Sequence, residues 1–379
     1  MHLILILLMA LATATPSPSP ADALFQGGDF DGAYAAYKAA IIADPDSANA
    51  LTGMGTLELY RNQLVAAERH LQQAAKLEPG DRRINARLKT LSDRLPNGSF
   101  KVAMDRPEID LAMVAVDPLP IVHLRVNGIE GTFFIDTGAD TVDLSFDSAP
   151  KFHVAPHKEG SGIFAGGKTA DVFAGHIDDI SAPGIRIANV DANIIPQPMN
   201  IDGRVVDGAI GTVFLSHFLS TIDYRAKQLV LRDRSQSAAF EASEVGRGAA
   251  IVPMWLVGDH FIFIRGSVGN AEGLYNLDTG GAGIGLQLTK ASLDAAHITP
   301  DSTKASSFRG GGGSVTVFPF SAPEVSVGSV TRRDVPGAYF PDGDQYGIFP
   351  FTVAGTISHE FFRPGSVTFD FDAMNVVVD

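Results

Sequence analysis

The chain contains no cysteine among its 379 residues. This absence excludes a disulfide, a thiolate nucleophile and a Cys-ligated zinc or iron–sulfur cluster, so any catalysis must come from Asp, Glu, His, Ser, Thr, Lys or Tyr. Basic residues are also scarce, since 29 Lys and Arg face 43 Asp and Glu and give a net charge of −14. Such a surface repels phosphate backbones, so we expect no nucleic-acid partner.

The N-terminus has little charge and an apolar run over residues 3–11, which is too short to span a bilayer. Ala12-Thr13-Ala14 follows with the small-x-small pattern of a signal peptidase site. We interpret residues 1–14 as a secretory signal peptide and residues 15–20 as a Pro/Ser linker. The protein is then expected to be exported, periplasmic or secreted, with no stable membrane span; a short membrane anchor is the alternative.

Residues 21–95 are rich in Ala, Leu, Gln, Glu and Lys at helical spacing and repeat with a period of 34. The repeated positions are Ala33, Tyr37, Ala40 and Pro45, which recur as Ala67, Leu71, Ala74 and Pro79. The pattern resembles the tetratricopeptide repeat and predicts a small all-α domain. Two interpretations stay open: a module that binds a protein partner, or a helical layer that covers an edge of the main domain.

Residues 96–108 form the next predicted linker. Pro96 and Asn97-Gly98-Ser99 are typical of an exposed boundary. We therefore expect the helical domain to be dispensable for the folding of the residues that follow it.

From Lys101 onward short apolar runs alternate with Gly, Pro and Asn-Gly, which predicts β structure. This part of the chain contains an internal duplication. Residues 127–138 form a turn, a hydrophobic strand and Asp-Thr-Gly, and the same order recurs 142 residues later in residues 269–280. Residues 208–215 align in the same way with residues 355–362 at an offset of 147. The sequence thus predicts two homologous lobes, residues 109–236 and 245–379, joined by a linker of residues 237–244.

The two Asp-Thr-Gly copies deliver Asp136 and Asp278 to the ends of apolar strands. If the lobes face each other about a pseudo-two-fold axis, the two carboxyl groups approach so closely that one keeps a proton while the other is charged. One site then holds an acid and a base, which can activate a water and polarise a peptide carbonyl. No metal, cofactor or covalent nucleophile is required.

At this point the residues resemble the aspartic peptidases, and more closely the retropepsin-like branch found as single-chain bacterial proteins with two lobes. The segment Phe134-Ile135-Asp136-Thr137-Gly138-Ala139-Asp140 carries the resemblance. It implies a mainly β fold of two pseudo-symmetric closed lobes, with Asp136 and Asp278 as the catalytic pair. The residues it implies as support for that pair are Thr137, Gly138, Gly211, Thr279 and Gly280.

The second copy departs from the family pattern at two positions. Ser358 stands where lobe one has Gly211, and Gly281 replaces the Ala or Ser that usually follows the catalytic turn. These departures put the rigidity of lobe two in question.

Each copy also has a Phe-x-Gly-Gly segment about 30 residues after its aspartate. In the family, a Gly-rich hairpin at this place forms a flap over the cleft, and the alternative is an ordinary surface turn. The candidate flap residues are Phe164, Gly166, Gly167, Gly310 and Gly311.

These features together predict an aspartic-type endopeptidase that binds an extended peptide or protein substrate. A hypothesis of a different class is a catalytically inactive scaffold that binds peptides through its lobes and helical repeats. Asp140 and Asp223 are expected to be dispensable for turnover.

Overall fold

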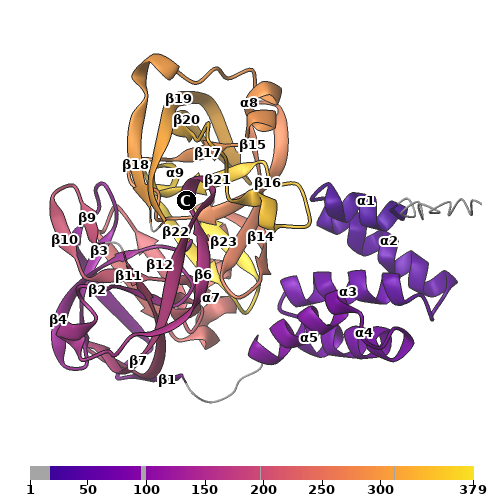
Figure 1. Ribbon diagram of the computed structural model, residues 1–379, viewed down its shortest axis with the longest axis horizontal. Helices are drawn as coiled ribbons and strands as arrows, with labels where there is room; N and C mark the ends of the chain where they lie inside the picture. The colour runs from indigo at the N-terminus through magenta and orange to yellow at the C-terminus, as the bar shows by residue number, and fades with distance from the viewer. Residues whose placement is uncertain (1–17, 95–99, 197, 311) are drawn as a thin grey trace, which may run out of the picture.

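The computed structural model describes residues 18–94, 100–196, 198–310 and 312–379 (Figure 1). The predicted signal peptide of residues 1–14 lies outside the described residues. The same is true of residues 15–17 and 96–99 of the two predicted linkers, and of Gly311. Within the described part of the chain, no helix is long and apolar enough to cross a membrane.

Five helices make up the N-terminal domain: α1 (Pro20–Gln26), α2 (Phe30–Ala43), α3 (Ala48–Tyr60), α4 (Leu64–Leu77) and α5 (Arg82–Arg94). Side chains of Ser19, Asp29 and Ser47 accept hydrogen bonds from free backbone N–H groups at the first three helix starts. The repeated small residues Ala33 and Ala67 are fully buried, which allows neighbouring helices to approach closely. The predicted helical repeat domain is therefore present.

The helical domain lies against the β domain rather than apart from it (Figure 1). One buried cluster joins α1, α2 and α3 to the second lobe and consists of Ala21, Phe30, Ala33, Tyr37, Ala50, Met54, Leu57, Tyr60, Trp255, Val257, Phe263, Leu274, Tyr346, Phe351 and Val353. We call it the docking cluster. At its centre the Phe30 ring meets Trp255 and Phe351 edge-on, with centroid distances of 5.5 and 4.9 Å.

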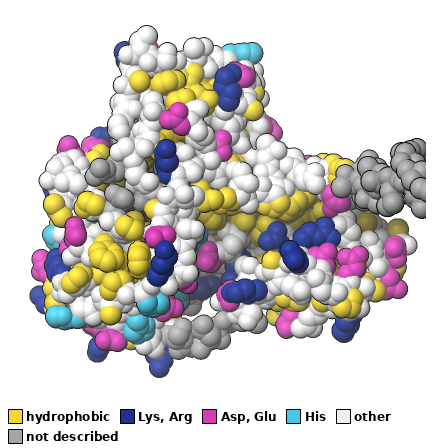
Figure 2. Space-filling model, viewed as in Figure 1, with side chains coloured by type: hydrophobic (Ala, Val, Ile, Leu, Met, Phe, Trp, Pro, Cys, Tyr) yellow, Lys and Arg dark blue, Asp and Glu magenta, His cyan; other side chains and the backbone are white. Residues whose placement is uncertain are grey.

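Three arginines add polar contacts around the docking cluster. Arg61 donates to the carbonyl oxygen of Met254 at 3.0 Å, and Arg94 donates to that of Leu256 at 2.6 Å. Arg265 of lobe two pairs with Asp29 at 2.8 Å. Figure 2 shows hydrophobic and basic side chains gathered where the helices meet the lobes. The helices thus cover an edge of lobe two, and this packing runs against the expectation that they are dispensable for its folding.

Lobe one contains β1 (Lys101–Met104), β2 (Glu108–Ala115), β3 (Ile121–Val126), β4 (Ile129–Ile135), β5 (Val142–Ser145), β6 (His157–Phe164), β7 (Lys168–Ala182), β8 (Ile185–Ile195), β9 (Met199–Ile201), β10 (Arg204–Val206), β11 (Gly208–Ile210), α6 (Thr212–Leu215), β12 (Leu219–Asp223) and β13 (Gln228–Arg232). Lobe two contains β14 (Ala250–Val257), β15 (Phe261–Val268), β16 (Ala271–Asp278), β17 (Leu286–Leu288), α8 (Lys290–Ala295), β18 (Ser306–Gly310), β19 (Gly313–Val327), β20 (Val330–Tyr339), β21 (Gly355–Ser358), α9 (His359–Phe362), β22 (Ser366–Asp370) and β23 (Asn375–Val378). Residues 237–244, expected as a linker, lie within helix α7 (Ser237–Arg247), which connects the lobes.

The lobes share one antiparallel sheet in the order β2, β13, β12, β22, β23, β14. At its centre Thr221 pairs with Thr368, the residue that the sequence duplication makes its counterpart, and their hydroxyl oxygens lie 2.7 Å apart. Equivalent residues that face each other across a sheet mark a pseudo-two-fold axis. The mainly β architecture of two related lobes is therefore confirmed.

Each lobe repeats one strand arrangement around its Asp-Thr-Gly turn. In lobe one, β11 lies between β4 and β5, parallel to the first and antiparallel to the second. In lobe two, β21 lies in the same way between β16 and β17. In each lobe the central strand thus pairs with the strand before the Asp-Thr-Gly turn and with the strand after it.

A chain that begins at Lys101 should be less soluble than the full chain, because it exposes Trp255, Phe263 and Phe351 of the docking cluster. Size-exclusion chromatography and thermal unfolding of both chains will measure this. A milder variant, Arg94→Gln, should lower the unfolding midpoint of the full chain because it removes hydrogen bonds to lobe two. The exposed Arg82→Gln serves as the matched control. A monomeric, cooperatively unfolding truncated chain would contradict the expectation.

Candidate active site

Each Asp-Thr-Gly turn follows a β-strand whose last residue before the aspartate is buried. In lobe one Phe133 and Ile135 are fully buried, so the strand is anchored in the core up to the residue before Asp136. The backbone N–H of Asp136 then donates to the carbonyl oxygen of Ile210 at 3.0 Å. In lobe two Leu277 is likewise fully buried directly before Asp278. Each aspartate therefore stands at the end of a fixed strand.

Two buried threonines lock the turns together across the lobe interface. The backbone N–H of Thr137 donates to Thr279 Oγ1 at 3.0 Å, and the N–H of Thr279 donates to Thr137 Oγ1 at 3.1 Å. Each hydroxyl in turn donates to a carbonyl of the opposite strand, at Leu277 and Ile135. The exposed fractions of Thr137 and Thr279 are 1% and 0%. These four reciprocal bonds fix the separation of the two aspartates.

Glycine is required after each threonine because the opposite aspartate lies directly against it. A methyl group on Gly138 would stand 2.5 Å from Asp278 Cγ, and one on Gly280 would collide with the carboxyl group of Asp136. The N–H of each glycine also donates to the aspartate of its own turn at 2.8 Å. The supporting residues from the sequence, Thr137, Gly138, Thr279 and Gly280, are thus brought together around Asp136 and Asp278.

The two carboxyl groups do not carry two full charges. Burial, the charge of Asp278 and a hydrogen bond shared with Asp278 raise the pKa of Asp136 well above its ordinary value. The pair can therefore keep one proton under conditions where two isolated aspartates would both be charged. A single site with one protonated and one charged carboxyl can act as acid and base together.

Gly211 lies beneath the first turn, where a side chain has no room. A methyl group there would stand 2.5 Å from the carbonyl oxygens of Asp140 and Thr141. Directly after it, the Thr212 hydroxyl donates to the carbonyl oxygen of Thr137 at 2.9 Å and braces the turn from below. Sequence reasoning found Gly211 and missed Thr212.

At the corresponding positions of lobe two, the glycine and the residue with a side chain have changed places. The Ser358 hydroxyl accepts from the N–H of Gly281 at 3.2 Å and donates to the carbonyl oxygen of Asp278. A methyl group on Gly281 would collide with that hydroxyl. Lobe one has Ala139 with Gly211, and lobe two has Gly281 with Ser358, so each lobe has one glycine and one residue with a side chain at these two positions. The Ser358 hydroxyl therefore occupies the space that a side chain at residue 281 would need, and its two hydrogen bonds support the second turn.

The first candidate flap is the hairpin of β6 and β7, whose tip reaches lobe two. Gly166 and Gly167 have φ values of 69° and 70°, which favour glycine. Methyl groups on them would meet Val315 and the carbonyl oxygen of Asp344. The second hairpin joins β18 to β19, with Gly310 opposite Gly313. Both hairpins therefore meet over the region between the lobes.

Beneath the hairpins lies a cleft of about 430 Å³. Asp136 and Asp278 line it together with Phe164, Phe308 and Gly310 of the hairpins. The other lining side chains are mostly apolar and include Leu119, Phe134, Ile163, Ile195, Met199, Ile201, Phe261, Ile284, Phe340 and Phe349. The geometry suits an extended chain with apolar side chains passing across the two carboxyl groups.

A second acidic group beside the cleft was not predicted. Burial and the neighbouring charge of Asp259 raise the pKa of Asp140 to about 6, and burial and Asp140 raise the pKa of Asp143 to about 7. Asp143 lines the cleft, and His260 lies close to Asp140. A substitution of Asp140 would therefore also change this second acidic group, and its dispensability for turnover stays a prediction. The missed signal is that Asp143 alternates with the buried Val142 and Leu144 and so faces the cleft.

Asp223 behaves as a turn residue. Its carboxylate accepts from the backbone N–H of Ala226 at 2.8 Å, and its counterpart Asp370 accepts from Asp372 and Ala373 in the same way. Neither residue lines the cleft. Asp223 is the better control position.

Two groups of side chains in the described residues have the donor atoms and spacing to hold a metal ion. One group is Asp140, Asp259 and His260, and the other is Asp117, His359 and Glu360. Neither group includes Asp136 or Asp278.

Comparisons with known proteins agree with both parts of this description. Residues 122–214 match the family described as aspartyl protease, and residues 24–90 match the tetratricopeptide repeat. No curated protein matches the chain. A similar solved structure is a retropepsin-like aspartic protease from Rickettsia conorii, 18% identical, which covers 36% of this chain and 93% of that one with a TM-score of 0.26. Because that score is low, functional conclusions rest on the site residues and the family match.

The exchanged pair in lobe two gives a double-mutant test. Gly281→Ala alone should cost about 1–3 kcal/mol by collision with Ser358, and Ser358→Gly alone about 1–2 kcal/mol by loss of two hydrogen bonds. The double variant reproduces the pattern of lobe one and should be more stable than the sum predicts. Urea unfolding of the four proteins measures the coupling. Purely additive effects would show that the two positions do not share one space.

Asp143→Asn should change how stability depends on pH. The folded-state pKa of about 7 exceeds the ordinary 3.8, so the folded protein keeps a proton that the unfolded chain releases, and stability falls as pH rises from about 4 to about 7. Asn removes this loss, which is at most about 4 kcal/mol. Urea unfolding should show Asp143→Asn stabilised at pH 8 and little changed at pH 4. An equal effect at both values, or one that Asp223→Asn reproduces, would refute the assignment.

Proposed function

We propose that this chain, whose lobe one matches the aspartyl protease family, is an aspartic-type endopeptidase. The observation that carries the proposal is the reciprocal threonine lock, which holds Asp136 and Asp278 in one site where the pair keeps a single proton. The family match lies in lobe one, which supplies only one of the two aspartates. The internal duplication and the second Asp-Thr-Gly turn supply the other aspartate.

In the proposed mechanism Asp278 is the base and Asp136 is the acid. Asp278 removes a proton from a water between the carboxyl groups, and the water oxygen bonds to the peptide carbonyl carbon. Asp136 donates its proton to the carbonyl oxygen, so a neutral diol forms. In the second step the C–N bond breaks, the nitrogen leaves with the proton now on Asp278, and Asp136 takes back a proton from the diol. Atoms and protons balance without a metal or a covalent intermediate.

Substrate would lie as an extended strand under the two hairpins. The flap residues Phe164 and Phe308 and the apolar lining favour hydrophobic side chains near the scissile bond. The glycines at the hairpin tips give the backbone room to approach substrate amides. The substrate class we propose is therefore an unfolded protein or peptide with apolar residues.

A protein partner for the helical repeats is a second proposal, suggested by the repeat match. The docking cluster already engages α1, α2 and α3 with lobe two. A partner would therefore meet the outward sides of the helices, such as the face of α4 that carries Glu68, Arg69 and Gln72. Export of the protein is also a proposal, and it rests on the pattern of residues 1–14 alone.

The alternative, an inactive peptide-binding scaffold, has less to support it. Its sequence basis was the departure of lobe two from the family pattern at Ser358. The hydroxyl of Ser358 instead fills the space beside Gly281 and bonds to the turn that carries Asp278. A damaged second site would not be expected to preserve such compensation.

The direct test is Asp136→Asn and Asp278→Asn, each made alone. Asn keeps the size of Asp but cannot act as the base or as the carboxylic acid, so each variant should lose at least about 100-fold in rate. The double variant should be scarcely worse, because the pair acts as one unit. Digestion of an unfolded protein at mildly acidic pH, with and without a pepstatin-type inhibitor, measures the rate.

Asp223→Asn is the matched control and should retain substantial turnover, since its carboxylate caps a turn away from the cleft. No digestion by the unsubstituted protein would favour the scaffold hypothesis. Near-full activity of Asp278→Asn alone would mean that lobe one acts without lobe two.

A further inference from the structure

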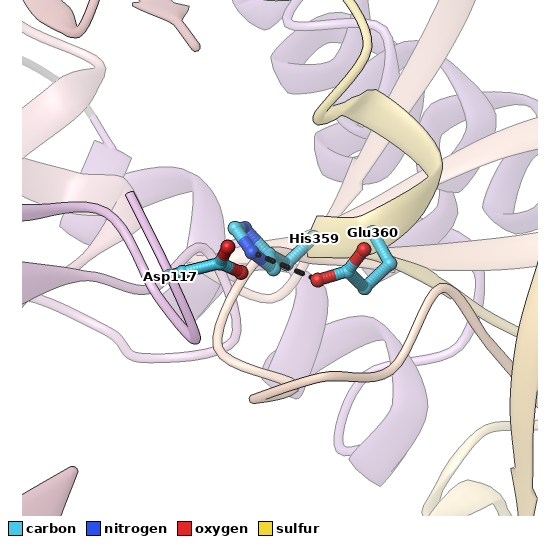
Figure 3. Close-up of side chains that lie close together, drawn as sticks. All are labelled: Asp117, His359 and Glu360. Carbon is cyan, nitrogen blue, oxygen red and sulfur yellow. Dashed lines mark ion pairs between the residues drawn. The ribbon is translucent and has the colours of Figure 1, made fainter. Parts of the chain in front are cut away.

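A polar group outside the proposed catalytic pair lies where the two lobes meet. Asp117 belongs to the connection between β2 and β3 of lobe one, and His359 and Glu360 open helix α9 of lobe two. Figure 3 shows the three side chains converging from these separate segments. One donor atom from each lies within 4.8 Å of the other two.

His359 is the unusual member of this group. Its exposed fraction is 0%, and neither ring nitrogen has a hydrogen-bond partner among the described residues. The nearest acidic oxygen is Glu360 Oε1, 3.5 Å from Nε2, which is too long for a good hydrogen bond. A buried imidazole with two unsatisfied nitrogens costs free energy. Such a group calls for a ligand that the protein atoms alone do not supply.

Packing explains the position of the ring but does not satisfy its nitrogens. The ring of Tyr224 meets His359 edge-on with centroids 5.2 Å apart. The Tyr224 hydroxyl is itself buried without a partner. Tyr224 therefore holds the imidazole in place and leaves it free to bind toward Asp117 and Glu360.

We propose that Asp117, His359 and Glu360 bind one zinc ion between the lobes. Imidazole nitrogen and carboxylate oxygen are both ligands that Zn²⁺ binds in proteins, and a water would complete four-fold coordination. Calcium fits less well, since it prefers six to eight oxygen ligands and this group offers few. The separations between the donor atoms must shorten as the ligands close around the ion, and Asp117 is the exposed member of the group.

Arg363 is the cation that competes for this site. Its guanidinium lies 2.9 Å from Asp117 Oδ2 and 3.0 Å from Glu360 Oε2. Its side chain is 42% exposed, so it can turn toward solvent. Zinc would therefore have to displace the Arg363 guanidinium, and removal of that guanidinium should raise the affinity of the site for zinc.

The site would brace the lobes beside the cleft. Pro118 follows Asp117 and lines the cleft, while Ser358 precedes His359 and bonds to the carbonyl oxygen of Asp278. An ion shared by Asp117 and His359 would tie these two cleft segments together. Its role is structural, and the proposed hydrolysis does not pass through it.

The test is a calorimetric titration of the full chain, without a histidine tag and after treatment with a chelator, with Zn²⁺ alone. We expect one equivalent to bind and to raise the unfolding midpoint. Asp117→Asn should weaken binding at least about tenfold, and Arg363→Gln should tighten it. His359→Gln should abolish binding. If this buried variant does not fold, the Asp117→Asn variant at an exposed position still tests the proposal.

His260→Gln is the matched control, because His260 belongs to the other group of donor side chains, with Asp140 and Asp259. It should leave the zinc affinity unchanged. The proposal is overturned if the unsubstituted chain binds no zinc, if Asp117→Asn binds it equally well, or if His260→Gln is the variant that loses it.

Discussion

The reciprocal hydrogen bonding of Thr137 and Thr279 is the contact on which the rest of the site depends. Each threonine uses its backbone N–H and its hydroxyl on the opposite lobe, so neither lobe can move without breaking buried hydrogen bonds. This lock forces the carboxyl groups of Asp136 and Asp278 together. Their crowding then raises the pKa of Asp136, which makes one member of the pair an acid.

The helical domain is linked to this site through aromatic contacts. Phe351 of the docking cluster stacks with Phe349 at 5.5 Å and meets Phe263 edge-on at 5.2 Å. Phe349 in turn meets Phe261 edge-on at 5.0 Å, and both of these rings line the cleft. One contiguous set of aromatic rings thus connects the helical domain to the wall of the cleft.

Two groups near the interface between the lobes are costly to bury. Asp143 has an unsatisfied carboxyl oxygen, and His359 has two unsatisfied nitrogens. Natural folds keep such groups where a proton, an ion or a substrate satisfies them. In this protein Asp143 lines the cleft, and His359 directly follows Ser358, which bonds to the carbonyl oxygen of Asp278.

The sequence alone determined the duplicated β architecture, the helical repeats and the residues of the two Asp-Thr-Gly turns, because these depend on local patterns and on internal repetition. It did not determine that α1 to α3 pack on lobe two, since an apolar helix face has the same pattern whether a partner or its own chain covers it. Nor could it show that Ser358 replaces the missing side chain at residue 281, or that Asp117 meets His359. These relations join residues more than 70 positions apart, and only the tertiary structure decides which distant side chains share one space.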